Sequence, residues 1–232
     1  MGIRYSKIKG DREIILLKSF PCKYGKCSFC NYILDNSTNE EEINLINLEV
    51  LKNVTGEYGI LEVINSGSVF EIPQKSLFEI KTIATDKDIK ILYFEFYYGY
   101  VKRLNEIIDY FNGLEVRFIM GLETFDNDFR VNIYNKNFCL NEDDYLYLSK
   151  KVFSICLLVC VKGQSREMID NDIALGLKYF RHITVNVFID NGTPVKSDQE
   201  LKRWFVDKYS FLKNDPRVDF LVDNKDLGVF EN

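Results

Sequence analysis

Six short apolar runs recur along the chain, and segments in which apolar positions follow helical spacing separate them. The runs cover residues 13–18, 59–65, 89–96, 114–121, 153–161 and 183–189. They are almost continuously apolar instead of alternating, which is typical of parallel strands whose sheet is covered by helices on both faces. The pattern therefore predicts six buried, parallel strands.

Helical signals lie between these runs. Helices are predicted over residues 37–53, 73–85, 99–111 and 165–177. A proline near the first turn favours the start of the second helix, and the sequence SREMID favours a capping-box start for the fourth. The regular alternation of strand and helix indicates an α/β fold, a partial parallel (β/α)6 barrel of the TIM type. The active site of such a barrel lies at the carboxyl ends of its strands.

The length and composition are those of one large domain. The chain has 232 residues, of which 46% are hydrophobic, enough to form one core without internal division. No linker-like or repetitive segment interrupts the pattern of strands and helices. We therefore expect a single domain over residues 1–232, in which residues from about 211 to 232 form a C-terminal cap or extension.

Apolar and charged residues are distributed as in a cytoplasmic protein that acts on a small molecule. No apolar stretch approaches the roughly 18 residues of a membrane span, and the first residues lack the apolar run of a secretory signal. The formal net charge of -5 disfavours stable nucleic-acid binding, which depends on clustered Lys and Arg. We expect a cytoplasmic location, no membrane association and a small free substrate.

Three cysteines stand close together in the sequence SFPCKYGKCSFCNY, directly after the first predicted strand. They are Cys22, Cys27 and Cys30, with four and then two residues between them. Cysteines clustered in a reducing compartment are metal ligands or nucleophiles more often than disulfides. Three thiolates on a four-iron cubane leave one iron open to a further ligand, so the spacing favours an iron–sulfur cluster.

Zinc and purely structural thiols are the alternatives for this loop. A structural zinc site needs four ligands and usually has a second Cys or His pair at short spacing. The single histidine, His182, is far along the chain, and Cys156 and Cys160 fall inside an apolar run typical of buried structural cysteine. The ligand count therefore favours the cluster over zinc.

The cysteine loop resembles the signature of the radical S-adenosylmethionine (SAM) superfamily, with one residue more in the first spacing. That signature follows the first strand of a partial barrel. The resemblance implies a 4Fe-4S cluster held by Cys22, Cys27 and Cys30, with SAM as the second cofactor. It also implies that Phe29, just before the last cysteine, packs near the adenine, where an ordinary loop aromatic is the alternative.

The second predicted strand ends in the sequence NSGS. Its members, Asn65, Ser66, Gly67 and Ser68, offer backbone donors and hydroxyls with little side-chain bulk. The sequence resembles a motif of the elongator-type and archaeosine-synthase branch of the superfamily, which implies that this loop binds the methionine end of SAM. Without that resemblance, NSGS would be read as a turn.

The fourth predicted strand leads into GLETFDNDFRVNIYNKNF, which is similar to a stretch of the same branch. The resemblance implies that Gly121 and Leu122 pass near the adenine and that Glu123 faces the cofactor or the substrate. It also implies that Arg130 pairs with the cofactor carboxylate through its bidentate fork. Taken alone, Arg130 would be a solvated arginine on a helix surface.

Further polar residues near strand ends are candidates for substrate binding. Glu95 lies among aromatics at the end of the third predicted strand, where a buried carboxylate requires a partner. The ribose hydroxyls of the cofactor or the ring nitrogens of a guanine-like base would be such partners, and a carboxylate that reaches solvent at the strand end is the alternative. Asn186 would point inward if its apolar neighbours face the helices, and Asp190 is also compatible with a turn. For reading a guanine-like edge, the order of preference is Glu95, Glu123 and Asp190.

Over nearly its full length the chain resembles the bacterial queuine lyases of this superfamily. The resemblance implies a radical SAM lyase that cleaves the C–N bond of the free base queuine and releases 7-aminomethyl-7-deazaguanine. It also implies a reducing partner such as flavodoxin or ferredoxin. The alternatives are a radical SAM enzyme that modifies transfer RNA together with a partner subunit, and a non-catalytic iron–sulfur or zinc-binding module.

Overall fold

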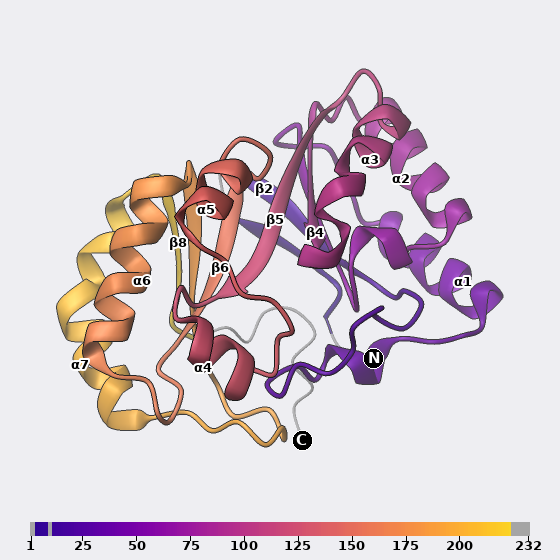
Figure 1. The fold of residues 1–232 in the computed structure, drawn as a ribbon. Helices are drawn as coiled ribbons and strands as arrows, with labels where there is room; N and C mark the ends of the chain where they lie inside the picture. The colour runs from indigo at the N-terminus through magenta and orange to yellow at the C-terminus, as the bar shows by residue number, and fades with distance from the viewer. Residues whose placement is uncertain (1–2, 9–10, 224–232) are drawn as a thin grey trace. The chain divides into compact units, whose positions relative to one another are not determined.

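The strands follow one another in chain order across a single sheet, β1-β2-β3-β4-β5-β6-β7-β8 (Figure 1). The computed structural model describes residues 3–8 and 11–223. Within them the strands are β1 (Tyr5–Ile8), β2 (Arg12–Leu17), β3 (Ile60–Asn65), β4 (Ile91–Phe96), β5 (Glu115–Glu123), β6 (Ser154–Val159), β7 (His182–Val187) and β8 (Val218–Leu221). β1 pairs antiparallel with β2, whereas β2 with β3, β3 with β4, and β5 through β8 pair in parallel.

All six predicted strands are confirmed, as β2 to β7. β1 was not predicted because its four residues, YSKI, are short and half polar. β8 and the 3-10 helix η4 (Ser210–Asn214) occupy the described part of the predicted C-terminal extension. The remainder of that extension, residues 224–232, lies outside the described residues. The sheet therefore has more strands than the predicted six.

Internal contacts divide the chain into two units. The described part of unit 1 comprises residues 3–8, 11–25 and 32–118, and that of unit 2 comprises residues 26–31 and 119–223. The expectation of a single domain stays a prediction. In the described part of the chain, no helix combines the length and apolar character needed to cross a membrane.

Unit 1 contains the helices α1 (Glu40–Leu51), α2 (Gln74–Asp86) and α3 (Leu104–Tyr110). α1 begins where the Asn39 side chain accepts a hydrogen bond from the N–H of Glu42. Three glutamates in the first turn of this helix are stabilised by the positive end of its dipole. α2 begins directly after Pro73. α1 and α2 pack against each other (Figure 1).

A buried carboxylate fixes the entrance to β3. Glu13 on β2 is fully buried and accepts hydrogen bonds from the N–H groups of Thr55 and Gly56 at 2.8 and 2.6 Å and from the Tyr5 hydroxyl at 2.7 Å. Burial opposes ionisation of Glu13, but these donors together lower its pKa. The turn before β3 is thus tied to the neighbouring strand β2.

Unit 2 contains the helices α4 (Asn127–Asn132), α5 (Glu142–Leu148), α6 (Arg166–Tyr179) and α7 (Gln199–Tyr209). α6 is the predicted fourth helix, and its Ser165 cap accepts a hydrogen bond from the N–H of Met168 at 3.2 Å. α4 and α5 were not predicted because each spans only about two turns. α7 was missed although Leu201, Phe205 and Tyr209 recur every four residues and are buried.

Two glycines of unit 1 allow the cost of a strained backbone angle to be separated from the cost of a steric clash. Gly56 and Gly113 both have positive φ angles, 76° and 94°. A Cβ at Gly56 would lie 2.3 Å from the Lys87 carbonyl oxygen, whereas a Cβ at Gly113 meets nothing within 4 Å. We predict that Gly56→Ala lowers the free energy of unfolding by more than about 2 kcal/mol and Gly113→Ala by about 1 kcal/mol. Urea unfolding of both variants checks this, and equal losses would contradict it.

Candidate functional site

The loop that follows β3 in unit 1 carries the NSGS sequence and is closely packed. Asn65, Ser66 and Ser68 are 3%, 2% and 0% exposed. The Ser66 hydroxyl accepts a hydrogen bond from the N–H of Ser19 at 3.0 Å, which joins the ends of β2 and β3. The Asn65 side chain donates to the Ser68 carbonyl oxygen at 3.0 Å.

Two buried polar atoms of this loop have no hydrogen-bond partner among the described residues. They are Asn65 Oδ1 and the Ser68 hydroxyl oxygen. Buried polar atoms without partners are rare in folded proteins, because each one costs free energy. A ligand that donates hydrogen bonds, such as the amino group of an amino acid, would satisfy them. The loop therefore fits the polar methionine end of SAM, a role that stays a prediction for its four residues.

Gly67 is required by close packing inside unit 1. A Cβ at this position would lie 3.1 Å from Glu71 Oε2, 3.3 Å from the Ser19 hydroxyl oxygen and 3.4 Å from the Cys22 Cα. A larger residue would crowd the Glu71 carboxylate and the Ser19 hydroxyl. The sequence therefore places its smallest residue where the segment around Cys22 approaches most closely.

Glu71 was not predicted to be a site residue. It ends the 3-10 helix η2 (Val69–Glu71) and is 7% exposed. Its carboxylate accepts hydrogen bonds from the N–H groups of Lys23 and Ser68 at 3.2 and 2.6 Å and from the Tyr100 hydroxyl at 2.6 Å. Burial raises the pKa of Glu71, and the three donors counteract that effect. The signal in the sequence was a single acidic residue inside the otherwise apolar VFEIP.

The three cysteines of the loop are half-buried thiols. Cys22 belongs to unit 1, and Cys27 and Cys30 belong to unit 2. The N–H of Cys30 donates to the Cys27 carbonyl oxygen at 3.3 Å, so these two thiols project from one tight turn. No group of three Cys, His, Asp or Glu side chains in the described ranges is arranged as a metal site. Three thiols within nine positions of the sequence are a donor set that fits an iron–sulfur cluster, and ligation by all three stays a prediction.

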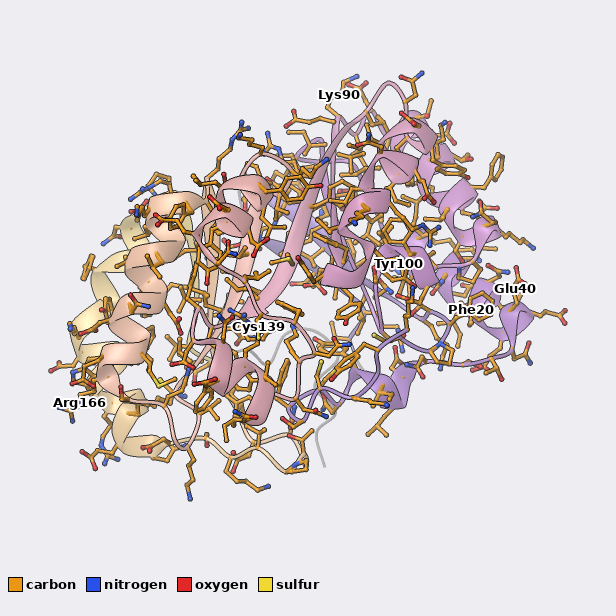
Figure 2. All side chains as sticks on the ribbon, in the orientation of Figure 1. Phe20, Glu40, Lys90, Tyr100, Cys139 and Arg166 are labelled. Atoms are coloured by element: carbon orange, nitrogen blue, oxygen red, sulfur yellow. The ribbon has the colours of Figure 1, made fainter. Side chains whose placement is uncertain are left out.

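Cys139, Cys160 and His182 lie outside the cysteine loop, and their surroundings do not suggest a role as metal ligands. Cys160 is fully buried, and burial raises the pKa of its thiol to about 12, so the thiolate is disfavoured. Cys139 is exposed at the surface of unit 2 (Figure 2). His182 Nδ1 lies 3.0 Å from the Ser154 hydroxyl oxygen, and its ring stacks on Phe153. These contacts indicate a structural role for His182.

Phe29 is held by the core of unit 2. Its ring meets the Tyr134 ring edge-on, with centroids 5.2 Å apart, and packs against a buried cluster that includes Phe129 and Leu158. Its carbonyl oxygen accepts a hydrogen bond from the Asn191 side chain at 2.9 Å. The turn between Cys27 and Cys30 is therefore attached to unit 2 through both the ring and the carbonyl group of Phe29. The contact of Phe29 with an adenine stays a prediction.

The end of β5 departs from regular strand geometry. The register of β5 against β6 shifts between Gly121 and Glu123, and Glu123 has a positive φ of 69°. A Cβ at Gly121 would lie 2.6 Å from Glu123 Oε1, so a larger residue would displace the Glu123 carboxylate. Leu122 is the fully buried residue between them. The bulge thus turns the Glu123 carboxylate toward the space beside Gly121.

Glu123 forms a buried ion pair with Lys136. The Lys136 Nζ to Glu123 Oε1 distance is 2.7 Å, and the two side chains are 7% and 8% exposed. Burial opposes the charge of Lys136, but the nearby carboxylate keeps its pKa raised. Lys136 also donates to the Gly121 carbonyl oxygen and lies 5.7 Å from the centre of the Phe29 ring. Lys136 was not predicted to be a site residue, although it lies in the NKNF part of the quoted stretch.

Arg130 organises the turn after β5. It is 0% exposed, and its Nε donates to the carbonyl oxygens of Thr124 and Leu122 at 3.1 and 3.3 Å. Its Nη1 donates to the Asn127 side chain at 2.5 Å. Burial lowers the pKa of Arg130. The alternative of a solvated surface arginine is therefore wrong, and pairing with a cofactor carboxylate would require a ligand to reach a fully covered side chain.

Asp172 on α6 accepts hydrogen bonds from the same turn after β5. It is 0% exposed, and its Oδ1 accepts hydrogen bonds from the N–H of Phe125 and the Thr124 hydroxyl at 2.6 and 3.0 Å. Its Oδ2 is buried and has no partner within the described residues. Burial raises the pKa of Asp172 to about 7.

The remaining substrate candidates differ in their surroundings. Glu95 lies on the half-buried face of β4, opposite the buried Phe94 and Phe96. Asn186 lies on the half-buried face of β7, and its neighbours Val185 and Val187 are buried on the opposite face. Asp190 is exposed and accepts a hydrogen bond from the N–H of Ser197 at 2.6 Å, which lowers its pKa.

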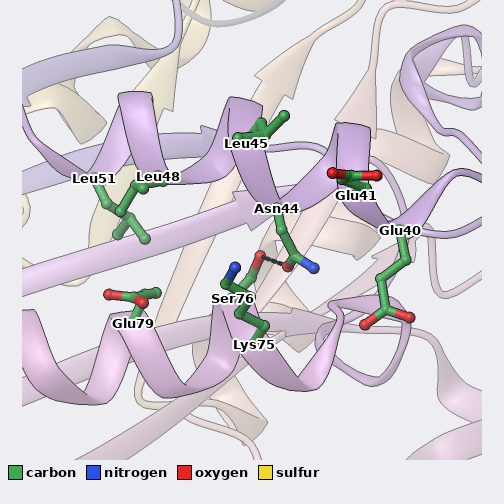
Figure 3. Close-up of a pocket in the computed structure, with 9 residues that line it drawn as sticks. All are labelled: Glu40, Glu41, Asn44, Leu45, Leu48, Leu51, Lys75, Ser76 and Glu79. Atoms are coloured by element: carbon green, nitrogen blue, oxygen red, sulfur yellow. Dashed lines mark hydrogen bonds between the residues drawn. The ribbon is translucent and has the colours of Figure 1, made fainter.

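A cavity of about 380 Å³ lies between α1 and α2 in unit 1. Figure 3 shows its walls, where the Ser76 hydroxyl donates to the Asn44 side chain at 2.8 Å. Its lining residues are Glu40, Glu41, Asn44, Leu45, Leu48, Leu51, Lys75, Ser76 and Glu79. None of the predicted site residues is among them, so this cavity is separate from the predicted chemistry.

Comparison with solved structures found chains of high similarity. The chain is similar to queuine lyase from Clostridium spiroforme bound to SAM and queuine, with 43% sequence identity and a TM-score of 0.93. The match covers 100% of this chain and 100% of that chain. No family model matches the sequence, and no curated protein matches it.

The buried Asp172 should make stability depend on pH. Because its folded pKa is about 7 and its ordinary value is 3.8, the folded chain binds this proton more tightly, and stability falls as the pH rises through that window. Between about pH 6 and about pH 8 this group should account for a loss of roughly 1 kcal/mol. Asp172→Asn should lose correspondingly less in urea unfolding at the two pH values, whereas the exposed control Asp128→Asn should follow the wild type. Equal losses in Asp172→Asn and wild type would contradict the assignment.

Proposed function

The chain belongs to the queuine lyase family of radical SAM enzymes, and on that premise we propose that it cleaves the C–N bond of the free base queuine. The product would be 7-aminomethyl-7-deazaguanine. The observation that carries this proposal is the full-length match at 43% identity to a queuine lyase bound to SAM and queuine. The same match confirms the predicted family, the predicted partial barrel of the radical SAM type and the predicted class of enzyme.

We assign the cofactor ligands from the loops described above. Cys22, Cys27 and Cys30 would hold a 4Fe-4S cluster through their thiolates, which leaves one iron open. When bound, the reduced cluster and SAM together supply a 5′-deoxyadenosyl radical that abstracts a hydrogen atom from the substrate. A reducing partner such as flavodoxin or ferredoxin would provide the electron, in the reducing environment of the cytoplasm.

The NSGS loop would bind the methionine end of SAM. The oxygen atoms of Asn65 and Ser68 that lack partners among the described residues would accept from an ammonium group of a ligand that reaches them. Phe29, Gly121 and Leu122 are assigned to the adenine side by the family resemblance alone. Arg130 is better suited to hold the turn after β5, because its donors already meet backbone carbonyl groups.

A carboxylate would bind the deazaguanine ring by accepting hydrogen bonds from its paired N–H groups. Glu123 is held by Lys136 in a buried ion pair, and Asp190 closes its own loop by accepting from Ser197. Glu95 stays the first choice because it is a carboxylate among aromatic residues on the half-buried face of β4. Asn186 remains a candidate for a further polar contact with the substrate.

Reconstitution tests the reaction directly. The protein is loaded anaerobically with iron and sulfide and incubated with SAM, dithionite and queuine. Mass spectrometry should then detect both 5′-deoxyadenosine and 7-aminomethyl-7-deazaguanine. Cys30→Ala should lose bound iron and both products, whereas Cys139→Ala, which changes an exposed cysteine outside the loop, should retain them. Deoxyadenosine without base cleavage would rule out queuine as the substrate, and base release only from transfer RNA would favour the alternative enzyme.

The assignment of Glu95 has its own test. Glu95→Gln keeps the size of the side chain but replaces one acceptor oxygen with a donor, so binding of queuine should weaken by roughly tenfold or more. Cluster loading and uncoupled formation of 5′-deoxyadenosine should be retained. The control Glu49→Gln, at an exposed position of α1, should bind queuine like the wild type. Unchanged queuine affinity in Glu95→Gln would shift the assignment to Glu123.

A further inference from the structure

Glu71 contacts the segment around Cys22 on both sides of that cysteine. The Glu71 carbonyl oxygen accepts a hydrogen bond from the N–H of Phe20 at 3.0 Å. Its side-chain Oε1 accepts a second from the N–H of Lys23 at 3.2 Å. One residue therefore fixes the backbone two positions before Cys22 and one position after it.

The second oxygen of the same carboxylate holds the NSGS loop. Oε2 accepts a hydrogen bond from the N–H of Ser68 at 2.6 Å, and a Cβ on Gly67 would lie 3.1 Å from it. The Ser68 carbonyl oxygen in turn accepts the amide of Asn65 at 3.0 Å. Glu71 thus orients the two residues whose buried oxygen atoms, Asn65 Oδ1 and Ser68 Oγ, have no partner within the described residues.

Tyr100 keeps the Glu71 carboxylate in this position. Its hydroxyl donates to Oε1 at 2.6 Å, and its ring stacks on Phe70 with centroids 4.5 Å apart. The Lys23 ammonium group lies 4.9 Å from the centre of the Tyr100 ring. Tyr100 and Phe20 are both labelled in Figure 2. Glu71 is consequently buried and in contact with two segments that are far apart in the sequence.

We propose that Glu71 is a positioning residue that sets the segment around Cys22 and the NSGS loop at a fixed distance from each other. This inference rests on the proposed function, in which Cys22 is a cluster ligand and the NSGS loop binds SAM. A carboxylate suits this role because both of its oxygens accept, and all three groups that meet them are N–H or O–H donors. An amide at the same place would turn an N–H group toward a donor.

Glu71→Gln tests the inference with two readouts. In the reconstituted protein, the Kd for SAM should rise roughly tenfold, because charged hydrogen bonds to the loop are lost. In the full chain without its cluster, alkylation of Cys22 should become several-fold faster relative to the exposed Cys139, measured by mass spectrometry of the peptides. Glu49→Gln, which removes an exposed charge, should leave both readouts at the wild-type values.

Tyr100→Phe provides a milder variant in case Glu71→Gln does not fold. It removes only the hydroxyl donor, so both readouts should shift in the same direction by a smaller factor. Wild-type values in both readouts would overturn the inference. A change in only one readout would also overturn it, because Glu71 would then serve one segment alone. A wild-type protein that binds SAM but does not cleave queuine would contradict the proposed function and leave this inference intact.

Discussion

Buried carboxyl groups that accept backbone N–H groups hold the connections around the parallel strands. Glu13 holds the turn before β3, Glu71 holds the loop after β3, and Asp172 holds the turn after β5. Loops cannot satisfy their own backbone donors as helices and strands do, so a buried loop needs such acceptors. The position of the NSGS loop, which is assigned to SAM, depends on Glu71, a residue that itself need not touch a ligand.

The second constraint is close approach of backbone segments. Gly67 and Gly121 each leave room for an acidic side chain that turns back toward the glycine, Glu71 and Glu123 respectively. In both places the glycine has no unusual backbone angle, so the requirement is space and not conformational freedom. Motifs that look like simple small-residue turns therefore carry a steric role.

The strands and the principal helices were predictable because their signals are local. Apolar runs defined β2 to β7, and a cap such as Ser165 marked the start of α6. The contacts of Glu71 and Asp172 were not predictable, since their partners Lys23 and Phe125 lie 48 and 47 positions away along the chain. The burial of Arg130 was missed for a different reason. Its partners are local, but the polar residues beside it in the sequence resemble those of an exposed helix. Motif resemblance located the loops but could not reveal which side chains hold them.

The agreement between strand order and chain order bears on synthesis of the protein. Each strand pairs with the strand that precedes it in the sequence, so no strand waits for a distant partner. A chain that leaves the ribosome amino terminus first can therefore extend its sheet one strand at a time, and each new edge is covered by the next segment to emerge. An unpaired parallel edge, which invites association with other chains, would be exposed only briefly during translation.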